Sequence, residues 1–170
     1  HHHIQRGPNN NNTIVLGNMI LQLYIKMGSM DDAYNFLLRM EDPSDTLFEQ
    51  ANIRSYTIVM QGFVSYDRLY DASMLLYTLC HSGRKLDNIV FSAILNEYAG
   101  RGMTLEFKSI LNTLLPHSGV TPDLNTFHLL IKTYANQTPP DPNACENVLL
   151  ELHSVGIKPT TTTYTIIMYR

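Results

Sequence analysis

An apolar segment that begins with an aromatic residue recurs along the chain, and this recurrence constrains the fold more than any other feature. The aromatic anchors stand 35, 36 and 37 residues apart, at Tyr56, Phe91, Phe127 and Tyr164. A run that starts at Gly17 fits as an earlier copy, 39 residues before Tyr56. A period of this length is typical of arrays whose small units bury their apolar faces only against neighbouring units.

The apolar residues inside each copy follow the spacing of an α-helix. After Tyr56 they fall at Val59, Met60, Phe63 and Val64, which is one face of a helix and not the alternation of a strand. A second run in the same unit repeats the spacing at Ala72, Leu75, Leu76 and Leu79. Each unit is therefore predicted to be a pair of helices, here called the first and the second helix of the repeat.

Turn residues separate the predicted helices at regular places. A break falls 11 residues after each anchor, at Gly28, Asp67, Gly102 and Thr138. The last three complete units close with a glycine, at Gly83, Gly119 and Gly156. Glycine ends helices because it adopts the left-handed conformation without a side-chain clash. The expected fold class is all-α, a right-handed superhelical solenoid of about four complete helix-turn-helix repeats and the start of a fifth.

The period divides the chain into a short polar stretch and an array. Residues 1–13 are expected to be a polar linker, and His1–His3 are either the remnant of an affinity tag or the tail of a preceding helix. The final residues stop within an apolar pattern, so both ends look like cuts through a longer protein. The predicted units are 14–52, 53–87, 88–123, 124–160 and the partial unit 161–170.

Composition excludes several classes of function. Charged residues make up 16% of the chain and the net charge is −3, which leaves no cationic tail for nucleic acid and no polybasic membrane anchor. No apolar run approaches the roughly 20 residues that span a bilayer. Cys80 and Cys145 form neither a disulfide framework nor a zinc pattern, and both are expected to be buried thiols in a reducing compartment.

Motifs for catalysis or metal binding are not visible in the sequence. The acidic residues are scattered, and no phosphate-binding loop, GxSxG or HExxH pattern occurs. Four histidines lack the spacing of metal ligands: His81, His117, His128 and His153. We therefore expect no catalytic role, no metal, no cofactor and no small-molecule substrate for this segment, although a catalytic domain beyond it stays possible.

Details of the units separate two kinds of helical repeat. The tetratricopeptide repeat requires an early tryptophan and a small residue four positions later, but this chain has no tryptophan and carries bulky residues there. The chain instead resembles the pentatricopeptide repeat family over residues 14–170. The segments that carry the resemblance are Ile53–Val59 at the opening of a unit, Lys26–Ala33 between helices, and the closings Gly119–Asp123 and Gly156–Thr160.

The resemblance implies that the segment binds single-stranded RNA, with about one base per repeat. In this family two side chains per repeat contact the base, one just after the anchor and one at the repeat's end. The matching base-reading pairs are Asn18 with Asn52, Thr57 with Asp87, Ser92 with Asp123, and His128 with Thr160, while Thr165 starts a fifth pair. The family pattern implies a pyrimidine for the first pair and guanine for the second and third, and it leaves the fourth undefined.

Two further sets of residues complete the expected RNA site. The family holds each base between side chains near the starts of adjacent first helices, and the matching residues are Val15, Arg54, Ile89, Asn125 and Thr162. Phosphate contacts are expected from the few cations on first helices, chiefly Lys26 and Lys132. An ordinary structural role competes with base reading, because Ser, Thr, Asn and Asp at helix starts are common caps, and Asp87 and Asp123 fit that role.

The leading functional prediction is an organellar RNA-binding segment that acts in RNA processing, stability or translation. The resemblance implies a mitochondrial location, with the chloroplast as the alternative. A second interpretation is a scaffold subunit of a large assembly, such as a mitochondrial ribosome, that contacts ribosomal RNA or protein subunits without a base code. The weak positive charge and the irregular fourth pair motivate it. A third is the substrate-binding arm of an RNA-processing enzyme.

Overall fold

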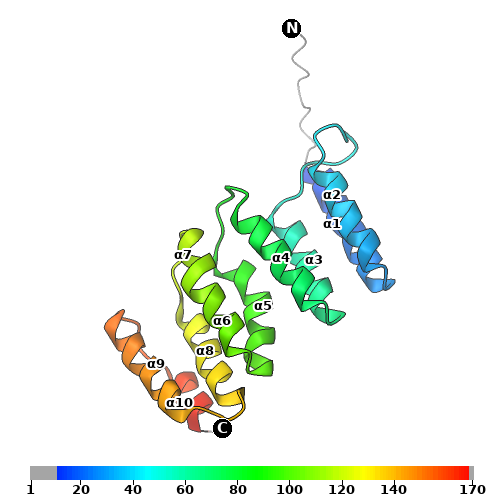
Figure 1. Ribbon diagram of the computed structural model, residues 1–170. Coiled ribbons are helices and arrows are strands. Elements are labelled where there is room, and N and C mark those ends of the chain that lie inside the picture. Colours follow the sequence, from blue (N-terminus) through cyan, green and yellow to red (C-terminus); the bar gives the residue numbers. More distant parts are fainter. Residues whose placement is uncertain (1–10, 169–170) are drawn as a thin grey trace. The chain divides into compact units, whose positions relative to one another are not determined.

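The computed structural model describes residues 11–168, and every regular element within them is helical (Figure 1). The expectation of an all-α fold built from helical repeats is therefore confirmed. His1–His3 and residues 1–10 of the expected linker lie outside the described residues. The chain divides into two compact units, residues 1–75 and residues 76–170, and each is described by itself.

The first unit holds two first helices and the second helix between them. These are α1 (Asn11–Lys26), α2 (Met30–Glu41) and α3 (Ile53–Ser65), followed by the start of α4 (Leu69–Cys80). Helix α1 packs against both α2 and α3, and α2 also packs against α3. Helix α1 takes in residues 11–13, so it begins before the expected unit start at residue 14.

The second unit continues from the end of α4 with α5 (Asn88–Arg101), a segmented second helix, α8 (Leu124–Asn136), α9 (Pro142–Ser154) and α10 (Thr161–Met168). Helix α8 packs against α5, α9 and α10, so it lies at the centre of this unit (Figure 1). Within each unit, the first helices thus contact one another in order, α3 against α1, α8 against α5 and α10 against α8. This is the neighbour-to-neighbour packing expected of a helical repeat.

The second helix of the third repeat departs from regular α geometry. It runs through α6 (Thr104–Ser109), the π-helical turn η1 (Ile110–Leu114) and α7 (Leu115–His117). Pro116 has no N–H for the regular bond to the carbonyl four residues earlier, so an α-helical ladder cannot continue unbroken through this place. A π-helical turn wraps the backbone more widely at this point.

The anchor aromatics of the complete repeats form the core as expected. Tyr56, Phe91 and Phe127 are buried, and both cysteines are buried free thiols, which confirms these predictions. The expectation that Tyr164 is a core residue is wrong, because its side chain is 51% exposed. Helix α10 packs against α8 on one side, and among the described residues no second helix follows to cover Tyr164.

Three of the four predicted break residues, all except Thr138, have the left-handed backbone conformation that ends a helix. Gly28, Gly102 and Asp67 have φ angles of 80°, 65° and 58°, in the left-handed region. Gly102 is the most constrained, since a Cβ there would overlap the backbone of Asn136 and Gln137. In residues 11–168, no helix combines the length and apolarity needed to cross a bilayer.

Candidate nucleic-acid interface

The predicted base-reading residues at the repeat ends are caps of the following first helices. The Oδ1 atoms of Asn52, Asp87 and Asp123 accept hydrogen bonds from the backbone N–H groups of Ser55, Ile89 and Thr126, at 3.0, 3.1 and 2.9 Å. The capping role is therefore confirmed for all three. Thr160 stands at the matching place before α10, where its backbone N–H donates to Thr163 Oγ1 at 2.9 Å.

Capping leaves part of each exposed acidic side chain free. Only the Oδ1 atoms of Asp87 and Asp123 hold the helix starts, and Asp123 Oδ1 also accepts from Thr126 Oγ1 at 2.8 Å. No hydrogen bond of either Oδ2 atom is found among the described residues. Both side chains are exposed. Capping and contact with a ligand are therefore geometrically compatible at these positions, because the two roles can use different oxygens of one carboxylate.

The hydroxyl base-reading residues are turned toward their own helices. Thr57 Oγ1 donates to the Ile53 carbonyl at 2.9 Å, and Ser92 Oγ donates to the Ile89 carbonyl at 2.7 Å. Thr165 does the same toward Thr161 at 2.8 Å. Each hydroxyl hydrogen is used inside the helix. The hydroxyl oxygen can therefore only accept a hydrogen bond from a ligand, through its lone pairs.

Of the base-reading residues that directly follow an anchor, the two without a hydroxyl, Asn18 and His128, are tied to the next first helix. Asn18 is 7% exposed, and its Oδ1 accepts from Ser55 Oγ at 2.6 Å. His128 Nε2 lies 2.7 Å from Thr163 Oγ1. Burial lowers the pKa of His128, and the charge of Asp123 opposes this effect only in part. His128 is therefore a neutral imidazole near pH 7.

The residues expected to hold bases apart are on the surface. Val15 and Ile89 are 56% and 70% exposed, and the other three members of the set are also exposed: Arg54, Asn125 and Thr162. Arg54, Ile89, Asn125 and Thr162 each occupy the second position of their helix. The structure thus places these four residues at equivalent and accessible positions, whereas Val15 lies one turn farther into α1.

The expected phosphate contacts lie farther along their helices. Lys26 is the exposed last residue of α1, and Lys132 is half-buried in the second half of α8. Arg101, at the end of α5, makes an ion pair with Glu97 at 2.7 Å. The structure therefore does not bring these cations to the helix starts, where the other predicted residues gather.

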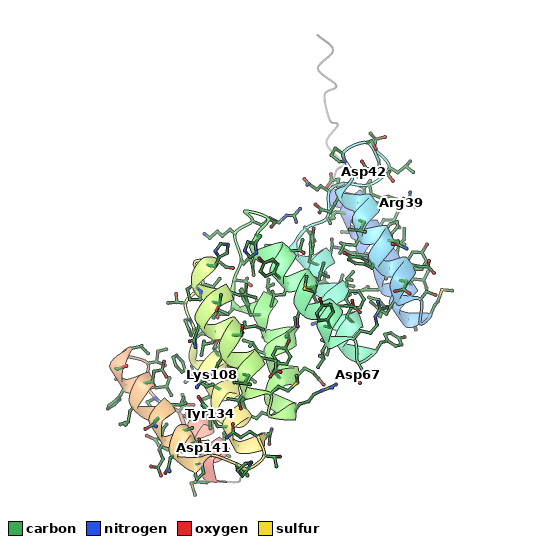
Figure 2. The ribbon with its side chains drawn as sticks, viewed as in Figure 1. Arg39, Asp42, Asp67, Lys108, Tyr134 and Asp141 are labelled. Atoms are coloured by element: carbon green, nitrogen blue, oxygen red, sulfur yellow. The ribbon has the colours of Figure 1, made fainter. Side chains whose placement is uncertain are left out.

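The sequence did not point to a pocket in the second unit. It has a volume of about 360 Å³. It is lined by residues of α6, η1, α8 and α9 and by Asp141, the cap of α9, and none of these is a predicted base-reading residue. Lys108 Nζ lies 5.4 Å from the centre of the Tyr134 ring, and Asp141 is close to both (Figure 2). Contact with Tyr134 raises the pKa of Lys108, and the charges of Asp141 and Glu151 add to this.

The sequence also did not point to the buried hydroxyls that contact Asn18 and His128. A signal was present, because Ser55, Thr126 and Thr163 each stand directly before an anchor aromatic. Histidines cluster without forming a metal site: the rings of His81 and His117 stack with centres 4.4 Å apart. No group of three His, Cys, Asp or Glu side chains able to hold a metal is found across residues 11–168.

Comparison with known proteins supports the repeat assignment. No protein-family model matches the chain. A chloroplastic pentatricopeptide repeat-containing protein of Arabidopsis thaliana is 25% identical over 116 residues, which is 68% of this chain and 14% of that protein. Another pentatricopeptide repeat-containing protein of the same plant is 25% identical over 127 residues, which is 75% of this chain and 19% of that protein.

The chain is thus distantly similar to pentatricopeptide repeat proteins. It spans less than a fifth of the length of either relative. This similarity accounts for the paired helices and for the packing of α3 on α1, of α8 on α5 and of α10 on α8. It also lets the residues at the starts of the first helices be compared position by position from one repeat to the next.

Proposed function

We propose that this segment binds single-stranded RNA at the starts of its first helices, with about one base per repeat. The observation that carries the proposal is the recurrence, at the starts of α3, α5 and α8, of three features. These are a cap residue, an exposed side chain at the second helical position, and a polar side chain one turn later. The pentatricopeptide repeat relationship gives this recurrence its functional meaning.

The third repeat offers the clearest chemistry for a base. Asn88 Nδ2 donates to the Thr121 carbonyl at 2.9 Å, so the start of α5 lies against the loop that leads to Asp123. Ser92 offers lone pairs, because its hydrogen is used by Ile89, and the second oxygen of Asp123 also accepts. Guanine presents two adjacent donors on its Watson–Crick edge, the N1–H and the exocyclic amine. Two acceptors, one from each member of the pair, therefore favour guanine at this repeat.

A pair of variants at Asp123 separates base reading from capping. Asp123→Asn keeps a good helix cap but replaces one acceptor atom by a donor. Asp123→Ala removes both the cap and the acceptor. We expect Asp123→Asn to leave thermal stability nearly unchanged while it lowers the preference for guanine over adenine at the third base on the order of tenfold. Asp123→Ala is expected to lose about 1 kcal/mol of stability as well.

Fluorescence anisotropy with short RNAs tests the proposal as a whole. An oligonucleotide that contains pyrimidine-G-G is expected to bind more tightly than a scrambled sequence of the same composition. Equal and negligible binding of the two oligonucleotides, even at low salt where phosphate attraction is strongest, would show that the segment does not bind RNA by sequence.

The cellular setting of this function is an organelle, where the bound RNA is processed, stabilised or translated. One of the two relatives is described as chloroplastic, and the mitochondrion is the other candidate compartment. Imaging of the full-length protein fused to a fluorescent protein, together with markers for both organelles, distinguishes them. A diffuse signal outside both organelles would contradict the organellar assignment.

A scaffold role within a large assembly is the second candidate, and one surface favours it. Helix α1 and the residue directly after it expose five apolar side chains, each at least half exposed: Val15, Leu16, Met19, Leu23 and Met27. An apolar face of this kind is typical of a surface that contacts another macromolecule. If all RNAs bind equally weakly and Asp123→Asn has no effect on binding, the scaffold role is the better explanation.

A further inference from the structure

We propose that Ser55 and Thr163 are positioning residues for Asn18 and His128, the base-reading residues of the first and fourth repeats. Each buried hydroxyl occupies the acceptor atom of the base-reading side chain and so turns a hydrogen-bond donor toward the ligand. These two repeats therefore select cytosine or adenine over uracil or guanine. The inference about bases rests on the RNA binding proposed above, whereas the positioning itself does not.

The contact in the first unit has only one reasonable direction. Ser55 is 0% exposed, and its Oγ accepts from the Asn52 N–H at 3.1 Å. A buried hydroxyl needs a partner for its hydrogen, and its nearest acceptor is Asn18 Oδ1 at 2.6 Å, ahead of Asn52 Oδ1 at 3.1 Å. The Asn18 amide is thereby oriented, with its oxygen engaged and its nitrogen left as the donor.

The free nitrogen of Asn18 is accessible to a ligand. No hydrogen bond of Asn18 Nδ2 is found among the described residues. Among residues 11–168, Ser118 Oγ is the one fully buried side-chain nitrogen or oxygen atom without a hydrogen-bond partner, so Asn18 Nδ2 is not fully buried. Asn18 Nδ2 therefore reaches solvent although most of the side chain is covered.

The same arrangement recurs in the second unit. Thr163 is 0% exposed, and its Oγ1 accepts from the Thr160 N–H at 2.9 Å. Its hydrogen can go to His128 Nε2 at 2.7 Å or to Thr160 Oγ1 at 3.4 Å, and the shorter contact receives it. His128 Nε2 then accepts, so the proton of the neutral ring is on Nδ1. The histidine presents a donor, as Asn18 does.

The middle repeats lack this contact, which makes them an internal comparison. Val90 occupies the matching place in α5 and has no hydroxyl to offer. Thr126 occupies it in α8, but its Oγ1 lies 2.8 Å from Asp123 Oδ1, while Ser92 is bonded to its own helix. Thr57 and Ser92 accordingly present acceptors, and only Asn18 and His128 present donors.

The direction of the hydrogen bond separates the bases into two classes. At the centre of the Watson–Crick edge, cytosine N3 and adenine N1 accept, whereas uracil N3–H and guanine N1–H donate. A side chain fixed as a donor therefore fits cytosine or adenine and leaves an unfavourable donor-to-donor contact with the other two bases. The fourth repeat, whose base the family pattern leaves undefined, is in this way assigned to cytosine or adenine.

The first experiment needs no RNA. The ¹⁵N shifts of the His128 ring, measured above pH 7.5 in the protein alone, report which nitrogen carries the proton. We expect the Nδ1–H form in the natural sequence and in Thr163→Ser, and a mixture of forms or the Nε2–H form in Thr163→Val. Thr126→Val is the control, because it removes the hydroxyl at the same helical position without touching His128. An Nε2–H ring in the natural sequence, or no change in Thr163→Val, overturns the positioning role.

The second experiment measures discrimination. Two RNAs that differ only in cytosine or uracil opposite the fourth repeat are compared by anisotropy. We expect cytosine to be preferred about fivefold, the preference to disappear in Thr163→Val, and Thr163→Ser and Thr126→Val to keep it. Ser55→Ala is expected to remove the preference for cytosine over uracil opposite the first repeat. Ser55→Thr keeps the hydroxyl and is expected to keep this preference.

The outcomes of the two experiments keep the two proposals apart. If the protein binds no RNA, the proposed function fails and the assignment of bases fails with it, while the ring protonation still decides the positioning role. If RNA binds but the cytosine preference is absent, or survives in Thr163→Val, the assignment of bases is overturned although the RNA-binding function stands.

Discussion

Tyr66 Oη donates a hydrogen bond to the carbonyl of Ile25 across 2.7 Å, from the end of one first helix to the end of the preceding one. An equivalent contact occurs in the second unit, where Asn136 Nδ2 donates to the Ala99 carbonyl at 2.8 Å. The last carbonyls of a helix have no partner within the helix, so a side chain from the next repeat satisfies one of them. Neighbouring first helices are thus tied at their C-terminal ends.

Tyr66→Phe removes the hydroxyl while it keeps the ring. We expect a loss of about 0.5–1 kcal/mol in the free energy of unfolding, because water can partly replace the donor at this exposed site. Urea denaturation measures the change. Tyr70→Phe is the control, since Tyr70 is 76% exposed and no hydrogen bond of its hydroxyl is found among the described residues. Equal losses in the two variants would contradict a specific role for the Tyr66 contact.

Much of the fold could be predicted because each helix carries its own local signals. The spacing of apolar residues after Tyr56 defines one helix face, and Gly28 and Gly102 mark the ends of helices. The exposure of Tyr164 could not be read from this pattern. Periodicity shows which face of a helix is apolar, whereas burial also requires a neighbouring helix that covers it.

The candidate site was predictable only in part, for a similar reason. The caps at Asp87 and Asp123 follow from local sequence, since a cap contacts a backbone N–H two or three residues away. The contact between Ser55 and Asn18 joins residues 37 apart and depends on how two helices are stacked. Pairing of this kind follows from three-dimensional packing, so neither residue type alone could reveal it.

Gly102→Ala is expected to be among the most damaging single substitutions in the second unit. The φ angle of 65° disfavours any residue with a Cβ, and the new atom would overlap the backbone of Asn136 and Gln137, which cannot move like a flexible side chain. We expect a loss of about 3 kcal/mol or more. Calorimetry of the purified protein measures it.

Gly83→Ala is the control for this substitution. Gly83 has a similar φ of 75°, but a Cβ there meets no atom within 4 Å. The variant therefore carries only the cost of the left-handed conformation, about 1 kcal/mol. Equal losses in the two alanine variants would show that the close approach of Gly102 to Asn136 is not important for stability.

His128 is expected to make stability depend on pH. Burial lowers its pKa below the ordinary value of about 6.5, so the unfolded chain binds the proton more tightly than the folded one. The contribution to stability is therefore complete above about pH 6.5 and is lost as the pH falls through the lower folded pKa. Unfolding midpoints in urea, measured from pH 8 to pH 5.5, should decrease across this range.

His128→Gln is expected to flatten that decrease, because glutamine does not titrate. His153→Gln serves as the control, since His153 is an exposed histidine on α9 of the same unit. The interpretation fails if the midpoint of the natural protein does not change between pH 8 and pH 5.5. It also fails if both variants keep the full dependence.

The two thiols are expected to react slowly in the folded protein. Burial raises the pKa of Cys80 and of Cys145, and the charge of Asp141 raises that of Cys145 further. Since the thiolate is the reactive species, both the raised pKa and the buried position slow the reaction. We expect labelling by a thiol-specific disulfide reagent at pH 7.5 to be at least about tenfold slower than in 8 M urea, where an exposed thiol reacts freely.

Ser154→Cys is the control, because it adds an exposed thiol on the same helix as Cys145. One rapidly labelled thiol per molecule should appear in this variant alone. Fast labelling of the natural protein would contradict this prediction, because it would show that α4 or α9 opens easily and exposes its thiol.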